Sequence, residues 1–204
     1  QNEAGIERQS MEVDIVCVGY GPAAGGFLTT LTKQLINEDG TPAVESQAMP
    51  GMPPQILCYE RADDIGFGVS GVVTLARSIR ETFPDLDPAT IPMAAPVTQE
   101  KLVYMLDPIG ASRRPAMLRL ADTAIRAMRL VLPYKHDAIE LPWTPPFIRK
   151  HGGLVMSIGQ FNQWTGSQVM GTGLAQIWPG MPVAAPLIED NAVVGVRLAD
   201  QGVD

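Results

Sequence analysis

Two glycines separated by a single residue, Gly19 and Gly21, form the clearest chemical signal in the sequence. They begin the pattern G-x-G-x-x-G/A, in which Ala24 occupies the third position. In proteins with this pattern, the first glycine permits a tight turn and the second lets the backbone approach a pyrophosphate. The pattern therefore predicts a dinucleotide site contacted by Gly19, Gly21, Pro22, Ala23 and Ala24. The alternative is a glycine-rich turn that binds no ligand.

A strand and a helix must hold this loop in place. Residues 13–18 are largely apolar and β-branched, which is typical of a buried parallel strand. Pro22 suits the first position of a helix, whose free N–H groups would face the phosphates. Thr29, Thr30 and Lys33 are predicted to lie mostly on the outer side of this helix. Its predicted apolar stripe consists of Phe27, Leu28, Leu31, Leu35 and Ile36.

An acidic residue, Glu60, follows a second predicted strand at residues 55–59. A carboxylate at that position can accept hydrogen bonds from the ribose of an adenosine, and Arg61 lies beside it in the sequence. Glu60 comes about 40 residues after Gly21, twice the usual spacing of about 20. Residues 37–54 explain the excess as a polar insertion rich in proline and glycine. This acidic residue is compatible with both FAD and NAD.

Composition limits the remaining possibilities. The 204-residue chain has a net charge of −7 and a pI near 4.8, which argues against nucleic acid as a partner. No apolar run approaches the roughly 18 residues of a membrane-spanning helix. Cys17 and Cys58 fall inside predicted strands, so we expect buried free thiols in a reducing compartment. No catalytic residue and no metal ligand set stands out, which is consistent with chemistry carried by a cofactor.

A basic amphipathic helix is predicted over residues 115–132. We favour an ordinary helix that packs its apolar stripe on a sheet and leaves its polar face in water. The alternative is a helix that lies on an anionic membrane surface. The apolar stripe comprises Leu118, Ala121, Ile125, Met128 and Leu132, and the polar face comprises Arg119, Asp122, Arg126 and Arg129.

Ten short motifs occur along the chain in a fixed order. They are Val18-Gly-Tyr-Gly-Pro-Ala, Tyr59-Glu-Arg, Ile65-Gly, Ser70-Gly, Ala95-Pro-Val-Thr-Gln-Glu-Lys, His151-Gly-Gly, Ser157-Ile-Gly, Gln163-Trp, Trp178-Pro-Gly and Asp200-Gln-Gly. In their order and spacing, the motifs resemble the electron transfer flavoprotein–ubiquinone oxidoreductase family and its close bacterial relatives. The resemblance covers most of residues 11–204.

This resemblance implies a fold. It is an α/β, glutathione-reductase-like FAD-binding Rossmann fold with an added α+β region on the substrate side. The expected parts are a flexible lead-in (1–10), a βαβ core that binds FAD (11–83), an inserted substrate- or membrane-side region (84–150) and a return to the FAD-binding domain (151–204). Family members continue beyond Asp204, so we expect a chain truncated at its C-terminus. We therefore expect these residues alone to bind FAD weakly or not at all, and to lack quinone reductase activity.

The resemblance also implies a function and two further site residues. Members pass electrons from an electron transfer flavoprotein, through FAD and a four-iron–four-sulfur cluster, to ubiquinone at a membrane surface. The cluster ligands are not in this chain. Ser70 and Gly71 match the family's loop near the flavin, although the loop here is one residue shorter and lacks a histidine. For Ser70, a turn serine bonded to its own backbone is an equal alternative. His151 is given no catalytic role.

The implied location is peripheral, on the cytoplasmic side of a membrane. Three other functions stay open at this point. One is a related flavin-dependent reductase or hydroxylase of an isoprenoid or aromatic substrate. The others are a nucleotide-binding module without catalysis and an NAD-binding Rossmann domain.

Overall fold

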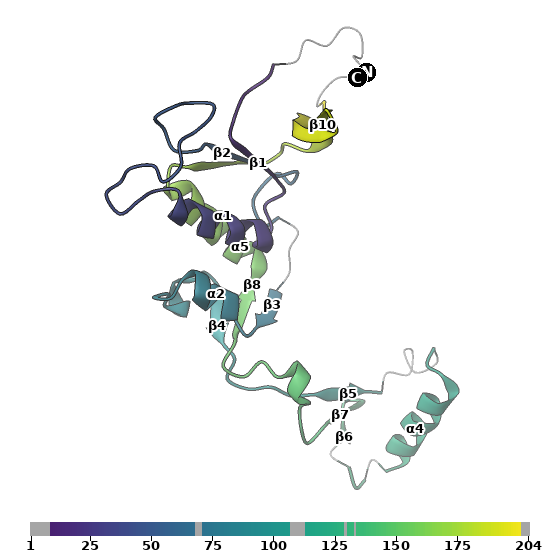
Figure 1. Cartoon of the computed structure of the whole chain (residues 1–204). Helices are drawn as coiled ribbons and strands as arrows, with labels where there is room; N and C mark the ends of the chain where they lie inside the picture. Colours follow the sequence, from purple (N-terminus) through teal and green to yellow (C-terminus); the bar gives the residue numbers. More distant parts are fainter. Residues whose placement is uncertain (1–8, 68–70, 107–112, 129, 133, 201–204) are drawn as a thin grey trace. The chain divides into compact units, whose positions relative to one another are not determined.

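Within the apolar run at residues 13–18, Ile15–Val18 forms the first strand of a small parallel sheet, as predicted. Its side chains are half-buried or, at Val18, exposed, so the predicted burial of this strand is wrong. The computed structural model of the protein describes residues 9–67, 71–106, 113–128, 130–132 and 134–200 (Figure 1). Strands β1 (Ile15–Val18), β2 (Ile56–Tyr59) and β9 (Ala175–Trp178) pair in the order β1-β2-β9, with all strands parallel. The chain divides into two compact units, Gln1–Ala95 with Val155–Asp204, and Pro96–Leu154.

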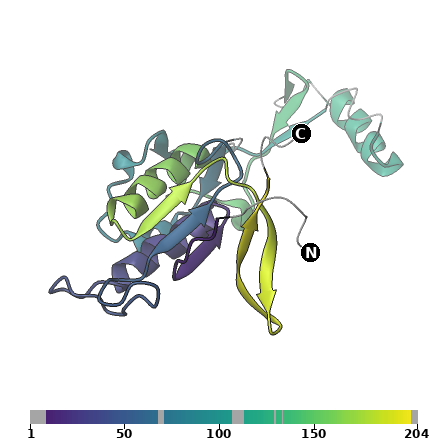
Figure 2. The ribbon, with the colours of Figure 1, turned by 90° about the horizontal axis from the view of Figure 1, so that it is seen from above.

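Two helices cover one face of this sheet. Helices α1 (Pro22–Gln34) and α5 (Ile158–Gly171) pack side by side, and both lie on the same side of the three strands (Figures 1 and 2). The sheet register places two rows of side chains in the core beneath them. These rows are Ile15, Ile56 and Ala175, and Cys17, Cys58 and Ile177. The predicted start of α1 at Pro22 is confirmed.

The buried side of α1 differs from the predicted stripe. Thr29 is buried, whereas Phe27 is 53% exposed, so the expected orientations of these two residues are wrong. The reason is that α1 packs against α5 as well as against the sheet, which widens and displaces its buried side. The Thr29 hydroxyl donates to the Gly25 carbonyl at 2.7 Å, and the Thr32 hydroxyl donates to the Leu28 carbonyl at 2.8 Å. These bonds satisfy both hydroxyls inside the core.

The remaining elements of the first unit include a second sheet and a hairpin. Strands β3 (Gly71–Thr74), β8 (Leu154–Ser157) and β4 (Ala94–Pro96) pair in the order β3-β8-β4. Two short helices, α2 (Arg77–Thr82) and η1 (Pro88–Thr90), lie between β3 and β4 in the sequence. Strands β10 (Val183–Glu189) and β11 (Ala192–Leu198) form an antiparallel hairpin.

The second unit holds a small antiparallel sheet and one longer helix. Strands β5 (Val103–Met105), β7 (Ala138–Glu140) and β6 (Tyr134–Lys135) pair in the order β5-β7-β6. Helix α4 (Ala116–Ala127) lies between β5 and β6 in the sequence, and the short η2 (Pro146–Ile148) follows β7. Within the described residues, no helix is long and apolar enough to cross a membrane.

Helix α4 packs through the face that was predicted to be solvated. Asp122 is only 3% exposed, and its carboxylate accepts from Arg114 Nη1 at 2.8 Å and from the Tyr104 hydroxyl at 2.6 Å. Arg126 Nη2 donates to the Leu106 carbonyl at 2.6 Å. The favoured prediction, in which the apolar stripe packs on a sheet, is therefore wrong. The reason is that Tyr104 and the Leu106 carbonyl, in and just after β5, form hydrogen bonds with the polar side chains of α4. Arg129 lies outside the described residues.

Candidate functional site

The glycine-rich loop leaves β1 through a turn that requires glycine. Gly19 has a φ of +85°, in the left-handed region that favours glycine. Its N–H donates to the Tyr59 carbonyl at 2.7 Å, which ties the loop to the end of β2. Gly19 therefore bends the chain while it keeps a hydrogen bond to the neighbouring strand.

Gly21 and Pro22 leave the start of α1 open and uncapped. Gly21 occupies the N-cap position and has no side chain that could cap the helix, and Pro22 follows in the first turn. The carbonyl of Gly21 accepts the first helical bond, from Gly25 N at 2.9 Å, so the N–H groups of Ala23 and Ala24 come before the helical ladder begins. A Cβ added at Gly21 would meet no atom within 4 Å, so the space over the loop is open. An open helix N-terminus of this kind suits a phosphate group.

Glu60 lies where the sequence predicted it. It directly follows β2, which is adjacent and parallel to β1, and its N–H donates to the Trp178 carbonyl at 2.9 Å. Its carboxylate accepts from Tyr20 N at 2.6 Å and from Ala62 N at 2.9 Å. The predicted position of Glu60, facing the glycine loop, is confirmed. Because each carboxylate oxygen has two lone pairs, Glu60 can still accept bonds from ligand hydroxyls.

Three further residues were predicted to belong to the site: Arg61, Ser70 and Gly71. Arg61 is exposed and directly follows Glu60. Gly71 begins β3, where an added Cβ would lie 3.5 Å from the Met156 carbonyl. Ser70 lies outside the described residues. The structure therefore brings Glu60 to the Gly19–Ala24 loop, while Gly71 adjoins β8.

Two backbone segments cross closely at Gly66 and Gly159, and the sequence analysis did not predict this crossing. A Cβ added at Gly66 would lie 2.4 Å from the Gly159 carbonyl oxygen, and one at Gly159 would lie 2.7 Å from the Gly66 oxygen. The segment after Glu60 therefore crosses directly over the start of α5. Both glycines belong to motifs of the resemblance, Ile65-Gly and Ser157-Ile-Gly, but their spacing in sequence gives no sign that they meet.

Two free thiols lie in β1 and β2, and the prediction that both are buried is confirmed for Cys58 alone. Cys58 is fully buried and Cys17 is half-buried. Burial raises the pKa of the Cys58 thiol to about 12 and also raises the pKa of the Cys17 thiol. Both groups are therefore protonated at neutral pH and act as small core residues. Among the described residues, no cluster of His, Cys, Asp and Glu side chains could hold a metal ion.

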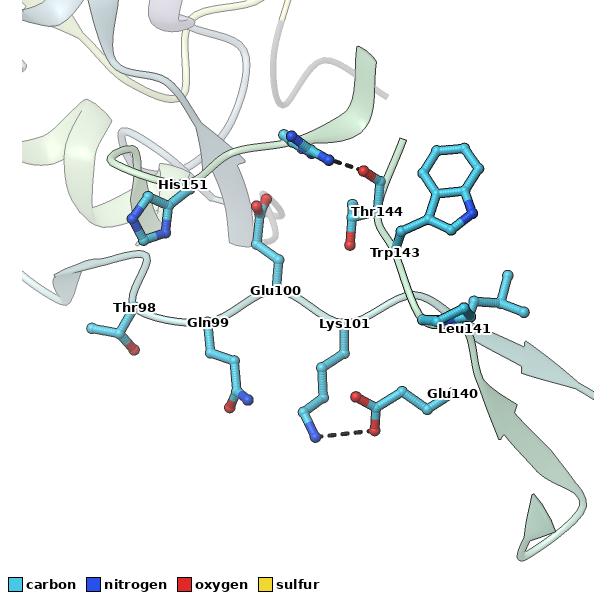
Figure 3. Close-up of a pocket in the computed structure, with 11 residues that line it drawn as sticks. Thr98, Gln99, Glu100, Lys101, Glu140, Leu141, Trp143, Thr144 and His151 are labelled. Atoms are coloured by element: carbon cyan, nitrogen blue, oxygen red, sulfur yellow. Dashed lines mark hydrogen bonds and ion pairs between the residues drawn. The ribbon is translucent and has the colours of Figure 1, made fainter. Parts of the chain in front are cut away.

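A separate, open pocket of about 510 Å³ lies within the second unit (Figure 3). Figure 3 shows the side chains of Glu100 and Lys101 leaving opposite sides of an extended segment. Lys101 Nζ pairs with Glu140 Oε2 at 3.0 Å, and His151 lies on the pocket's wall. Two motifs of the resemblance, at residues 95–101 and 151–153, therefore meet at this pocket. It contains none of the predicted dinucleotide-binding residues.

The parallel sheet, the glycine loop and the acidic residue after β2 together define an α/β dinucleotide-binding fold, and the predicted α/β fold class is confirmed. No protein-family model matches the chain. The predicted resemblance is also confirmed, because curated relatives over nearly the whole chain are named electron transfer flavoprotein–ubiquinone oxidoreductase.

The relative from Pseudomonas aeruginosa is 26% identical over 201 residues, which cover 98% of this chain and 30% of the relative. The mitochondrial protein from Mus musculus is 26% identical over 200 residues, which cover 97% of this chain and 26% of that protein. The chain therefore spans less than a third of the length of these relatives. Among solved structures, a geranylgeranyl bacteriochlorophyll reductase-like protein from Thermoplasma acidophilum has a TM-score of 0.47 at 15% identity, covering 91% of this chain and 34% of that one.

Proposed function

We propose that this chain is the FAD-binding part of an oxidoreductase that passes electrons from an electron transfer flavoprotein to ubiquinone. One observation carries the proposal. The open start of α1 at Gly21 lies beside a carboxylate, Glu60, that is hydrogen-bonded to the same loop. The names of the relatives supply the electron donor and the acceptor.

The residues of the loop would act on the cofactor by binding and orienting it. The N–H groups of Ala23 and Ala24 bind the pyrophosphate, where the partial positive charge of a helix N-terminus favours anions. Glu60 accepts hydrogen bonds from the ribose, and Arg61 lies toward the adenine end. By their match to the family's loop, Ser70 and Gly71 would lie near the flavin. When bound, FAD supplies the electron-transfer chemistry.

An iron–sulfur cluster does not fit the residues of this chain. A four-iron–four-sulfur cluster takes four thiolate ligands, and the chain has two cysteines, in a buried strand pair. We therefore assign no electron-transfer step through a cluster held by these residues.

Titration of the protein at its native length with FAD and, separately, with NAD⁺ tests the cofactor proposal. We expect FAD to bind in preference to NAD⁺ and its fluorescence to change on binding. Preference for NAD⁺, or binding of neither nucleotide, would contradict the cofactor assignment. Activity is tested at the protein's native length, as reoxidation of a reduced electron transfer flavoprotein by a short-chain ubiquinone. Flavin binding without this activity would favour the related reductase or hydroxylase.

A second proposal concerns α4, which we infer docks on an anionic membrane. Its outward side carries exposed apolar residues, including Met117 at 85% and Leu120 at 73% exposure. Arg113 and Arg119 are exposed beside them, so an apolar surface and positive charge occur together. Arg126 is unsuitable for this role, because it is bonded to the Leu106 carbonyl.

Co-sedimentation with vesicles that contain phosphatidylserine tests the membrane proposal. Arg119→Glu should weaken binding about fivefold or more, since each cation near an anionic surface contributes about 1 kcal/mol. Leu120→Glu should weaken it as well, by opposing apolar insertion. Arg77→Glu, a charge reversal at an exposed site in the other unit, serves as the matched control. Equal binding by all four proteins would reject membrane docking.

A further inference from the structure

The middle residue of the glycine loop, Tyr20, is buried in the core although its neighbours line an open site. Its side chain is only 2% exposed. Its hydroxyl donates to Thr165 Oγ1 in α5 at 3.3 Å. The large ring therefore passes beneath the loop and ends between the two helices.

Two glycines make room for the ring. A Cβ at Gly25 in α1 would lie 3.3 Å from the Tyr20 hydroxyl oxygen and 3.6 Å from Cζ. A Cβ at Gly166 in α5 would lie 3.5 Å from Tyr20 Cε1. Both helices thus lack a side chain where they face Tyr20, and the ring fills the space between them.

The main chain of Tyr20 is held from the opposite direction. Its N–H donates to Glu60 Oε2 at 2.6 Å, which links the loop directly to the acidic residue. A hydrogen bond to a carboxylate is among the stronger ones in proteins. Tyr20 is therefore held in two ways: its backbone N–H is hydrogen-bonded to Glu60, and its ring packs between α1 and α5.

We propose that Tyr20 is a positioning residue for the dinucleotide, and that its buried ring holds Gly19 and Gly21 in the geometry that admits a pyrophosphate. This inference rests on the proposed function for the identity of the ligand. A loop that is already in its binding geometry loses less entropy when the ligand binds. If the loop visited this geometry only a tenth of the time, affinity would fall about tenfold.

Two substitutions, made in the protein at its native length, separate the role of the ring from that of its hydroxyl. Tyr20→Ala should weaken FAD binding about tenfold per folded molecule, because the loop loses its support. Tyr20→Phe keeps the ring and loses only a long hydrogen bond, so its affinity should stay within about threefold of wild type. Leu28→Ala is the matched control, since Leu28 is fully buried in the same core cluster but does not belong to the loop. It should lower stability and leave affinity per folded molecule unchanged.

A suppressor experiment tests the fit of ring and glycine. The added methyl group of Gly25→Ala would lie 3.3 Å from the Tyr20 hydroxyl oxygen and 3.1 Å from Thr165 Oγ1, so it should displace the ring and weaken FAD binding. Combining it with Tyr20→Phe removes one of the two contacts and should recover part of the loss. An unchanged loss in the double variant would overturn the proposed fit.

Hydrogen exchange gives a readout that needs no ligand, at the N–H of Gly19, which donates to the Tyr59 carbonyl, and at the N–H of residue 20, which donates to Glu60. Tyr20→Ala should speed their exchange more than Leu28→Ala does at equal loss of global stability. Equal exchange in these two variants would overturn the positioning role. If wild type binds no FAD, the cofactor proposal fails, and the exchange rates alone then decide the role of Tyr20.

Discussion

Helices α1 and α4 have similar lengths, 13 and 12 residues, yet they pack through opposite kinds of residue. Helix α1 is the less amphipathic of the two, and it is enclosed by the sheet and α5. Helix α4 is strongly amphipathic, and it packs through Asp122, which pairs with Arg114 just before the helix, and through Arg126, while several of its apolar residues are exposed to solvent.

The difference shows that periodicity predicts a helix but does not decide which face packs. The polar groups of α1 that enter the core are threonines, which bond to carbonyls of the same helix. Those of α4 have charged side chains, which need partners outside the helix: Asp122 pairs with Tyr104 in β5 and with Arg114, and Arg126 donates to the Leu106 carbonyl. A buried charge is tolerated when it is paired and hydrogen-bonded.

The largest expected effect is at the start of α1. In the protein at its native length, Gly21→Val should weaken FAD binding about a hundredfold or more, since the β-branched side chain would fill the space of the pyrophosphate. The variant should still fold, because a Cβ at this position meets no atom within 4 Å. Calorimetric titration measures the loss.

Gly26→Ala is the matched control for that experiment, since its Cβ also meets nothing within 4 Å. It should bind FAD as wild type does and gain about 0.5–1 kcal/mol of stability, the usual gain from replacing a helical glycine. Retention of tight FAD binding by folded Gly21→Val would place the ligand elsewhere.

The second prediction concerns the polar side of α4. Asp122→Asn should lower the local stability of α4 by about 2 kcal/mol, because it leaves the Arg114 guanidinium without its counter-charge in a partly buried position. Hydrogen exchange of the α4 amides measures this loss. Glu140→Gln breaks an exposed ion pair with Lys101 and should change stability by less than about 0.5 kcal/mol. If Asp122→Asn were as mild as Glu140→Gln, the packed face of α4 would be misassigned.

A third prediction tests α5, the helix against which α1 packs. Gly159→Ala should lower the free energy of unfolding by about 2 kcal/mol, because its Cβ would lie 2.7 Å from the Gly66 carbonyl oxygen. Relieving this clash requires one of the two backbone segments to move. Gly171→Ala, at the other end of the same helix, meets no atom within 4 Å and should be neutral or slightly stabilising. Urea unfolding of the two variants gives the comparison, and equal stabilities would argue against a tight crossing.

The smallest effect is expected at Asp14, which fastens the insertion at residues 37–54 to the start of β1. Hydrogen bonds from Gln55 N and the Ser46 hydroxyl lower the pKa of Asp14 to about 2. Because this folded-state pKa lies below the unfolded value of about 3.9, the stabilisation is fully present above pH 4–5 and is lost as the pH falls toward 2.

Asp14→Asn should therefore be less stable than wild type at pH 6, and the difference should shrink as the pH falls from 5 to 2. Urea midpoints across this range measure it. Asp39→Asn, a carboxylate at the tip of the same insertion, is the control and should show a weaker trend. A difference that stays constant with pH would show that the Asp14 carboxylate does not hold the insertion.

The sequence by itself determined the parts of the site that depend on local chemistry. Gly19 must adopt a left-handed turn, and Pro22 cannot lie anywhere in the helix but its first turn. Glu60 faces the glycine loop because it directly follows a strand that is parallel and adjacent to β1. Each of these features follows from residues that are close together in the sequence or from the pairing rule of parallel strands.

The tertiary structure alone decided how that site is supported and which way α4 faces. Tyr20 is buried because Gly25 and Gly166, on two different helices, leave space for its ring. Gly66 and Gly159 meet although they are far apart in the sequence, and Asp122 enters the interior because Tyr104 and Arg114 are there to pair with it. Local sequence patterns do not distinguish which of these side chains becomes buried. Contacts between distant segments decide it, because the free energy of burying a polar or bulky group depends on the partners that surround it.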